Sequence, residues 1–112
     1  MKIQTFNTDV VFDQERVQTK VIIETSFSKE IRILLAKSQF MKEHKAPFSI
    51  VIHVLQGAIN LGVDGKIQKM ITGDLIALDA NVPHDLKAIQ DSIIRLSLSK
   101  RDKMERVEEV VK

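Results

Sequence analysis

The chain has 112 residues, of which 44% are hydrophobic and 29% charged, and its formal net charge is only +2. These values are typical of one ordinary globular domain, and we assign residues 1–112 to a single domain. Basic and acidic residues are interspersed and no aromatic platform is present, which argues against nucleic acid as a partner. Cysteine is absent, which excludes disulfides, thiolate catalysis and cysteine-ligated metal centres.

The chain shows no pattern that predicts export or membrane insertion. Its amino-terminal residues contain no apolar run of signal-peptide length. The longest apolar stretch, Ile50–Leu55, is far too short to span a bilayer. We therefore expect a cytoplasmic protein with no membrane partner.

Short strand patterns account for most of the chain. An Asp64-Gly65 pair between two apolar runs predicts a hairpin, because both central residues of a type I′ turn need positive φ. Many short strands without a long helical pattern between them predict an all-β fold, an antiparallel sandwich or barrel. The predicted strand runs lie, in chain order, at 21–23, 31–35, 48–55, 58–63, 66–71, 75–78 and 91–98, and His84 is expected to begin a further strand with Leu86 and Ala88 on the same face.

The last segment changes its period. Met104, Val107 and Val111 recur at helical spacing among Glu, Arg and Lys, and Ser99 followed by Asp102 forms a capping pattern. We expect a short amphipathic C-terminal α-helix over about 100–111. Its apolar stripe must cover either the flank of the domain or a partner subunit.

Two histidines lie in short frames whose spacing resembles the two motifs of the cupin family, and in particular of small single-domain bacterial cupins of the conserved-barrel, RmlC-like type. The resemblance covers about residues 37–99. The first frame is His44-x-Ala46-x-x-x-Ile50, with Gly57 after six further residues. The second frame is Gly73, five residues, Asp79-x-Asn81-x-x-His84, three residues and Ala88.

The resemblance implies an antiparallel double-stranded β-helix, the jelly-roll or cupin barrel, in a protein that is commonly a dimer. Members of the family hold a metal ion with three histidines and one glutamate from these two motifs. Only the first and last histidine have counterparts here, His44 and His84. Ala46 stands at the position of the second histidine and Ile50 at that of the glutamate.

Alternation along strands predicts which side chains share a face. Residues i and i+2 point the same way, so His44 should lie beside Ala46, whereas Glu43 and His53 should point to the opposite faces of their strands. By the resemblance, the inner face lines the barrel. We therefore expect two imidazoles above an aliphatic floor, in a pocket formed by His44, Ala46, Ile50, Ile52, Val54, His84, Leu86 and Leu96, with Leu98 as a further candidate.

Two functional interpretations remain open. In one, the chain is a metal-dependent enzyme of the oxygenase or isomerase class, with His44 and His84 as ligands of Zn, Fe, Ni or Cu. In the other, the chain binds a small-molecule ligand in the barrel and holds metal weakly or not at all. Catalytic metal sites normally have three protein ligands, so the missing ligands favour the binding protein.

We also expect a homodimer. The chain is small, and the stretch Ile50–Leu55 is apolar on both faces, which predicts that its outer face is covered. His53 belongs to that outer face. It lies either in the dimer interface or on the surface as a half-exposed side chain, and we favour the interface.

Overall fold

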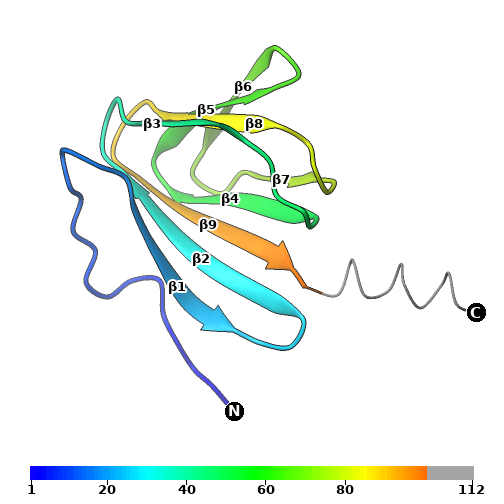
Figure 1. The fold of residues 1–112 in the computed structure, drawn as a ribbon. Helices are drawn as coiled ribbons and strands as arrows, with labels where there is room; N and C mark the ends of the chain where they lie inside the picture. The colour runs from blue at the N-terminus through cyan, green and yellow to red at the C-terminus, as the bar shows by residue number, and fades with distance from the viewer. Residues whose placement is uncertain (101–112) are drawn as a thin grey trace, which may run out of the picture.

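The structure, a computed structural model, describes residues 1–100 (Figure 1). The predicted C-terminal helix, with Met104, Val107 and Val111, therefore lies outside the described residues apart from its first position, Lys100. No helix long and apolar enough to cross a membrane is found between residues 1 and 100. The described chain forms nine strands: β1 (Gln18–Glu24), β2 (Ser28–Leu35), β3 (Phe40–His44), β4 (Ile50–Gln56), β5 (Ala58–Val63), β6 (Lys66–Ile71), β7 (Leu75–Leu78), β8 (His84–Ala88) and β9 (Ser92–Ser99).

The strands build two sheets, and every strand pairing is antiparallel. One sheet has five strands in the order β1-β2-β9-β4-β7, and the other has four in the order β3-β8-β5-β6. In Figure 1 the four-stranded sheet lies above the strands of the five-stranded sheet. The prediction of an all-β antiparallel fold is confirmed.

Three of the strand predictions agree with the structure at both ends. The predicted runs 58–63, 66–71 and 75–78 coincide with β5, β6 and β7. The predicted turn is also confirmed, since Asp64 has a φ of 53° and Gly65 a φ of 74°. By contrast, β3 was not among the predicted runs. Most of its side chains are exposed or half-buried, so its sequence lacks the apolar alternation by which strands are recognised.

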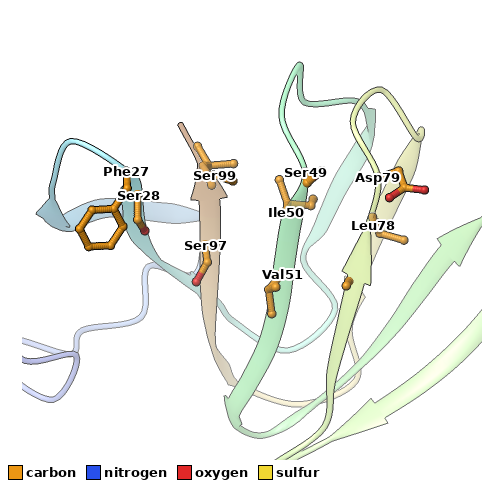
Figure 2. Close-up of a pocket in the computed structure, with 11 residues that line it drawn as sticks. Phe27, Ser28, Ser49, Ile50, Val51, Leu78, Asp79, Ser97 and Ser99 are labelled. Atoms are coloured by element: carbon orange, nitrogen blue, oxygen red, sulfur yellow. The ribbon is translucent and has the colours of Figure 1, made fainter. Parts of the chain in front are cut away.

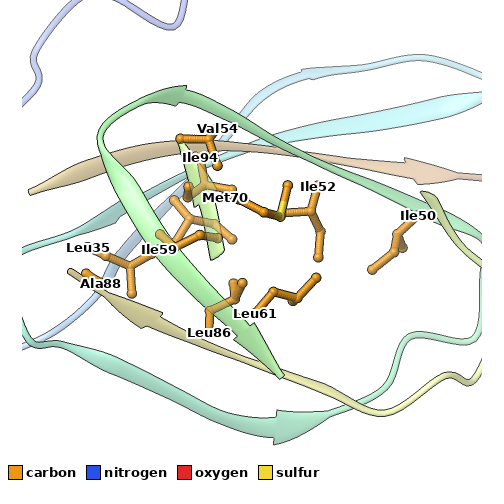
Figure 3. Packing of buried hydrophobic residues seen from close by; sticks show 11 residues of the cluster. Leu35, Ile50, Ile52, Val54, Ile59, Leu61, Met70, Leu86, Ala88 and Ile94 are labelled. Atoms are coloured by element: carbon orange, nitrogen blue, oxygen red, sulfur yellow. The ribbon is translucent and has the colours of Figure 1, made fainter. Parts of the chain in front are cut away.

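The core fills the space between the two sheets (Figure 3). Ile50, Ile52 and Val54 of β4 are buried, while the residues between them are only half-buried, as expected for a strand with one inner face. In the four-stranded sheet, Leu61 of β5 is the direct cross-strand partner of Leu86 of β8, and both are buried. Each such side chain contributes roughly 1.5–3 kcal/mol when it is removed from water.

The amino-terminal segment crosses the outer face of the five-stranded sheet. Arg32 of β2 is buried there and donates hydrogen bonds from its guanidinium to the backbone carbonyls of Phe6, Thr8 and Asp9. Further along, the side chain of Gln39 donates to the carbonyl of Asp13. These long-range bonds hold residues without strand structure against the sheet.

Candidate functional site

The structure brings His44 and His84 together. They are direct partners in the β3–β8 pairing, and their ring centroids lie 4.3 Å apart with the ring planes inclined by 59°. His84 is buried at 2% exposure, whereas His44 is exposed to solvent. One imidazole of the pair therefore belongs to the protein interior and the other to the surface.

A β-bulge in β3 decides which side chains accompany this pair. Met41 stands opposite Leu86 and His44 opposite His84, so three steps along β3 match two along β8. Regular alternation would place Met41 and His44 on opposite faces. With the bulge, both stand opposite buried residues, and Met41 packs against the core. Sequence analysis missed Met41 because it counted residues along a regular strand.

Both imidazoles are fixed by bonds to backbone carbonyls. Nδ1 of His44 lies 2.8 Å from the carbonyl oxygen of Lys42, and Nδ1 of His84 lies 3.0 Å from that of Val82. A carbonyl oxygen only accepts, so Nδ1 must carry the proton in each ring. In the neutral rings the lone pair is then on Nε2. Each histidine thus offers an acceptor, or a metal-ligand atom, of defined orientation.

Burial lowers the pKa of His84 below its usual value. The positive charge of a protonated His44 lowers it further, while the bond to the Val82 carbonyl and the Asp85 carboxylate oppose the shift. The charged form of His84 is disfavoured because a buried imidazolium loses its hydration. His84 is consequently neutral around pH 7.

This shift predicts that the folded state loses stability in mild acid. Because the folded-state pKa of His84 is lower, the unfolded chain binds more protons as the pH falls below about 6.5, the ordinary histidine value. The contribution of neutral His84 is fully present above that pH and is lost as the pH falls toward the folded-state pKa. Urea unfolding at a series of pH values between about 5 and 8 measures how the free energy of unfolding changes with pH.

The matched comparison uses His84→Gln and His53→Gln. The first variant should show a weaker fall in unfolding free energy over this pH range, whereas the second measures the general effect of removing an imidazole outside the pair. An unchanged slope in His84→Gln would contradict the assignment.

The aliphatic residues of the predicted pocket lie mainly in the packed core. Ile50, Ile52, Val54 and Leu86 are buried members of the core cluster, and Ala46 and Leu96 pack against it half-buried. The barrel beneath the two histidines is thus filled by these side chains.

A cavity of about 260 Å³ lies at the ends of β4, β7 and β9 (Figure 2). Val51, Ala77 and Ser97, which form one cross-strand row on the outer face of the five-stranded sheet, contribute to its lining. This cavity shares Ile50 with the predicted pocket, together with the further candidate Leu98. Neither His44 nor His84 lines this cavity.

The donor set around the histidine pair does not fit the four-ligand metal site of the motif. Among residues 1–100, no three His, Asp or Glu side chains are placed to hold a metal ion. Ala46 has no donor atom, and Ile50 is only 4% exposed within the aliphatic core. Gln39 is engaged elsewhere, since its side chain bonds to the backbone of Ala36 and Asp13. Glu43 lines a different cavity together with Asp85.

The backbone of the second frame nevertheless has a defined, special conformation. Asn81 of the second frame has a φ of 67°. Asparagine is one of the few residues that adopt this left-handed conformation readily. Its amide donates a 2.7 Å hydrogen bond to the carbonyl of Ala46. This bond links the two frames directly and positions the approach to His84.

Comparisons with solved structures agree with this fold. An RmlC-like cupin protein from Desulfovibrio desulfuricans is 20% identical, with a TM-score of 0.81 over 88% of this chain and 96% of the other. An RmlC-like cupin family protein from Methanocaldococcus jannaschii is 15% identical, with a TM-score of 0.76 over 95% and 96% of the two chains. KdgF from a Halomonas species is 18% identical, with a TM-score of 0.71 over 88% and 94%.

Sequence comparison gives the same family. No curated protein matches the chain. The sequence profile of the cupin domain matches residues 32–99, which is more than half of the 112 residues and includes both histidine frames. The chain belongs to the cupin family.

Proposed function

We propose that this cupin binds a small polar molecule at the mouth of its barrel and carries no tightly held metal ion. The observation that supports the proposal is the histidine pair. Two imidazoles are held 4.3 Å apart, and each presents Nε2 because its Nδ1 is bonded to the backbone. Buried His84, which is neutral around pH 7, supplies a hydrogen-bond acceptor. Exposed His44 accepts a hydrogen bond at Nε2, or donates one when that atom carries a proton.

The family itself does not select the function. The solved relatives described above are at most 20% identical to this chain, so they show the fold alone. Cupin barrels, like other common folds, serve unrelated activities, and function depends on the residues at the site. We therefore infer ligand binding from His44, His84 and the residues that stand in place of the family's other two metal ligands.

A metal-dependent enzyme of the oxygenase or isomerase class is the alternative. The two Nε2 atoms favour it, because neutral imidazole is a good ligand for Zn, Fe, Ni or Cu. The absence of a third protein ligand among residues 1–100 favours the binding protein instead.

Elemental analysis of protein purified without a histidine tag separates the two functions. After dialysis against a weak chelator, we expect wild type to hold far less than one metal ion per chain. Near-stoichiometric metal that is lost in His44→Ala but kept in His53→Ala would overturn the proposal and support the enzyme. His53 is a matched control because it is the third histidine of the chain and lies outside the pair.

Ligand binding is tested by NMR of the histidine rings. Small polyols and hydroxy acids are suitable probes, since their hydroxyl groups donate to imidazole Nε2. We expect a binding probe to shift the Nε2 resonances of His44 and His84 together and to leave His53 unchanged. A probe library that shifts none of the three rings would count against a ligand site at the pair.

We further propose that two copies of the chain form a dimer through the outer face of β4 and β7. Val51, His53 and Leu55 of β4 are half-buried in the single chain, and Leu75, opposite His53, is 63% exposed. A second copy would remove these apolar side chains from water. Sedimentation at micromolar concentration is expected to show a dimer. A single species near 12.7 kDa would contradict this expectation.

A further inference from the structure

The outer face of the five-stranded sheet carries a row of positive charges. Lys20 of β1 stands opposite Arg32 of β2, and Arg32 stands opposite Arg95 of β9. Residues directly opposite in antiparallel strands share a face and are close neighbours, so like charges in these positions repel one another. The arrangement is unfavourable unless negative charge lies nearby.

Only one end of this row is neutralised within the described chain. Arg95 forms an ion pair with Glu30, with Nε 2.8 Å from Oε1. Burial would raise the pKa of Glu30, but hydrogen bonds from Ser28, Ser97 and Arg95 outweigh burial and lower it, so Glu30 is ionised at pH 7. The carboxylate is thus committed to Arg95 and the two serines.

Arg32 has no such partner, although it is only 5% exposed. Its Nη1 donates to the carbonyls of Phe6 and Thr8 and its Nη2 to that of Asp9, all of which are uncharged. Its Nε is buried without a hydrogen-bond partner among residues 1–100. No carboxylate between residues 1 and 100 lies within 4 Å of either Arg32 or Lys20. A buried charge without a counter-charge is costly.

A cavity lies where these two cations meet. Its volume is about 320 Å³, and Lys20, Arg32 and Gln18 line it on the side of β1 and β2. Asp9 and Val11 of the amino-terminal segment form the opposite wall. Asp9 is the one acidic residue in the lining, and its carboxylate makes no ion pair with the two cations. The volume is sufficient for a small molecule or ion.

We propose that this cavity binds a small anion, a carboxylate or a phosphate, as the counter-ion of Lys20 and Arg32. The exposed ammonium of Lys20 binds the anion directly, and the buried charge of Arg32 attracts it through a medium of low polarity, where charges interact strongly. Because residues 9–11 form one wall, a bound anion also stabilises the amino-terminal segment on the sheet. This site is separate from the histidine pair and independent of the function proposed there.

Titration with inorganic phosphate and with acetate, at constant ionic strength, tests the proposal. We expect saturable NMR shifts at Lys20, at the Arg32 Nε–H and at the amides of residues 9–11, together with slower amide exchange in that segment. Lys20→Gln should weaken binding about tenfold, the equivalent of one charge-assisted hydrogen bond. Lys20→Arg, which retains the charge, should bind like wild type. The probe that binds with the higher affinity, phosphate or acetate, identifies the class of anion.

The matched control is Lys69→Gln, which removes one exposed lysine from β6 of the other sheet. It should leave the affinity unchanged. Equal affinities for Lys20→Gln and Lys69→Gln would show only a general effect of charge and overturn the proposal. Absence of saturable shifts with both probes would also overturn it and leave Arg32 as a clamp for the amino-terminal segment. Lys20 is exposed, so these variants do not depend on replacing buried Arg32.

Discussion

Replacing Ala46 by histidine and Ile50 by glutamate is expected to create a metal-binding protein whose stability depends on metal. The double variant would add the two ligand types that the first cupin motif lacks here, beside His44 and His84. Four convergent ligands should bind Zn²⁺ far more tightly than the two imidazoles of wild type. Isothermal titration of the metal-free proteins with Zn²⁺ measures the difference.

The same double variant should be less stable than wild type when metal is absent. Ile50 is 4% exposed and packs in the core, so a glutamate at this position loses its hydration. An unpaired buried carboxylate costs several kcal/mol or remains protonated through a raised pKa. Added metal should restore stability, because binding to the folded state alone contributes about 4 kcal/mol at a metal concentration 1,000 times Kd.

The control for this experiment is Ala46→His combined with Ile50→Gln. Glutamine has nearly the shape of glutamate but lacks the negative charge. This variant should therefore also be destabilised, but Zn²⁺ should restore less of its stability. Urea unfolding with and without Zn²⁺ compares the two. Equal rescue of both variants would mean that position 50 does not reach the metal, and the inferred correspondence of Ile50 with the family's glutamate would be wrong.

Gly57→Ala is expected to destabilise the fold by several kcal/mol. Gly57 lies between β4 and β5, where the chain passes from one sheet to the other, and its φ is 111°. A residue with a Cβ atom is strained in this region by about 1–3 kcal/mol. In addition, a Cβ here would lie 2.7 Å from the Asp91 carbonyl oxygen and 2.8 Å from Cα of Ser92, so the backbone itself would have to move.

Crowding at Gly57 also threatens a buried hydrogen-bond arrangement. Ser92, which is fully buried, accepts a bond from the Ala58 amide and donates to the Ala58 carbonyl, and its side chain would meet the added Cβ. The matched control is Gly73→Ala. Gly73 has a φ of 95° but no atom within 4 Å of the added Cβ, so this variant carries the backbone strain alone.

Denaturant unfolding of the two glycine variants separates the effects. We expect Gly57→Ala to lose clearly more free energy of unfolding than Gly73→Ala. Similar losses would mean that the neighbours of Gly57 move aside at little cost. There are two independent reasons for a glycine at position 57: its positive φ, and the close contact that a Cβ atom would make with Ser92. The comparison shows how much each of them contributes.

The amino-acid sequence by itself determined the local features of this protein. The apolar runs that form β5, β6 and β7 are flanked by Gly57, Asp64-Gly65 and Gly73, which mark bounds of these runs, and Asp64-Gly65 specifies its turn because few residue pairs adopt positive φ twice. The two frames indicated the cupin family, because spacing is preserved when residue types change. For the same reason, the positions of His44 and His84 in the two frames predicted that these two side chains share one site.

Only the tertiary structure decided how the site is made. The bulge in β3 brings Met41 and His44 to one side, and a bulge arises from pairing with β8, which counting along one strand does not reveal. The predicted floor of the pocket is packed core, because the facing sheet fills the space above β4. The row of Lys20, Arg32 and Arg95 was also invisible in the sequence. It exists only through the register of β1 and β2 with each other and with β9, which is distant along the chain, and this register is set by burial of the opposite, apolar face.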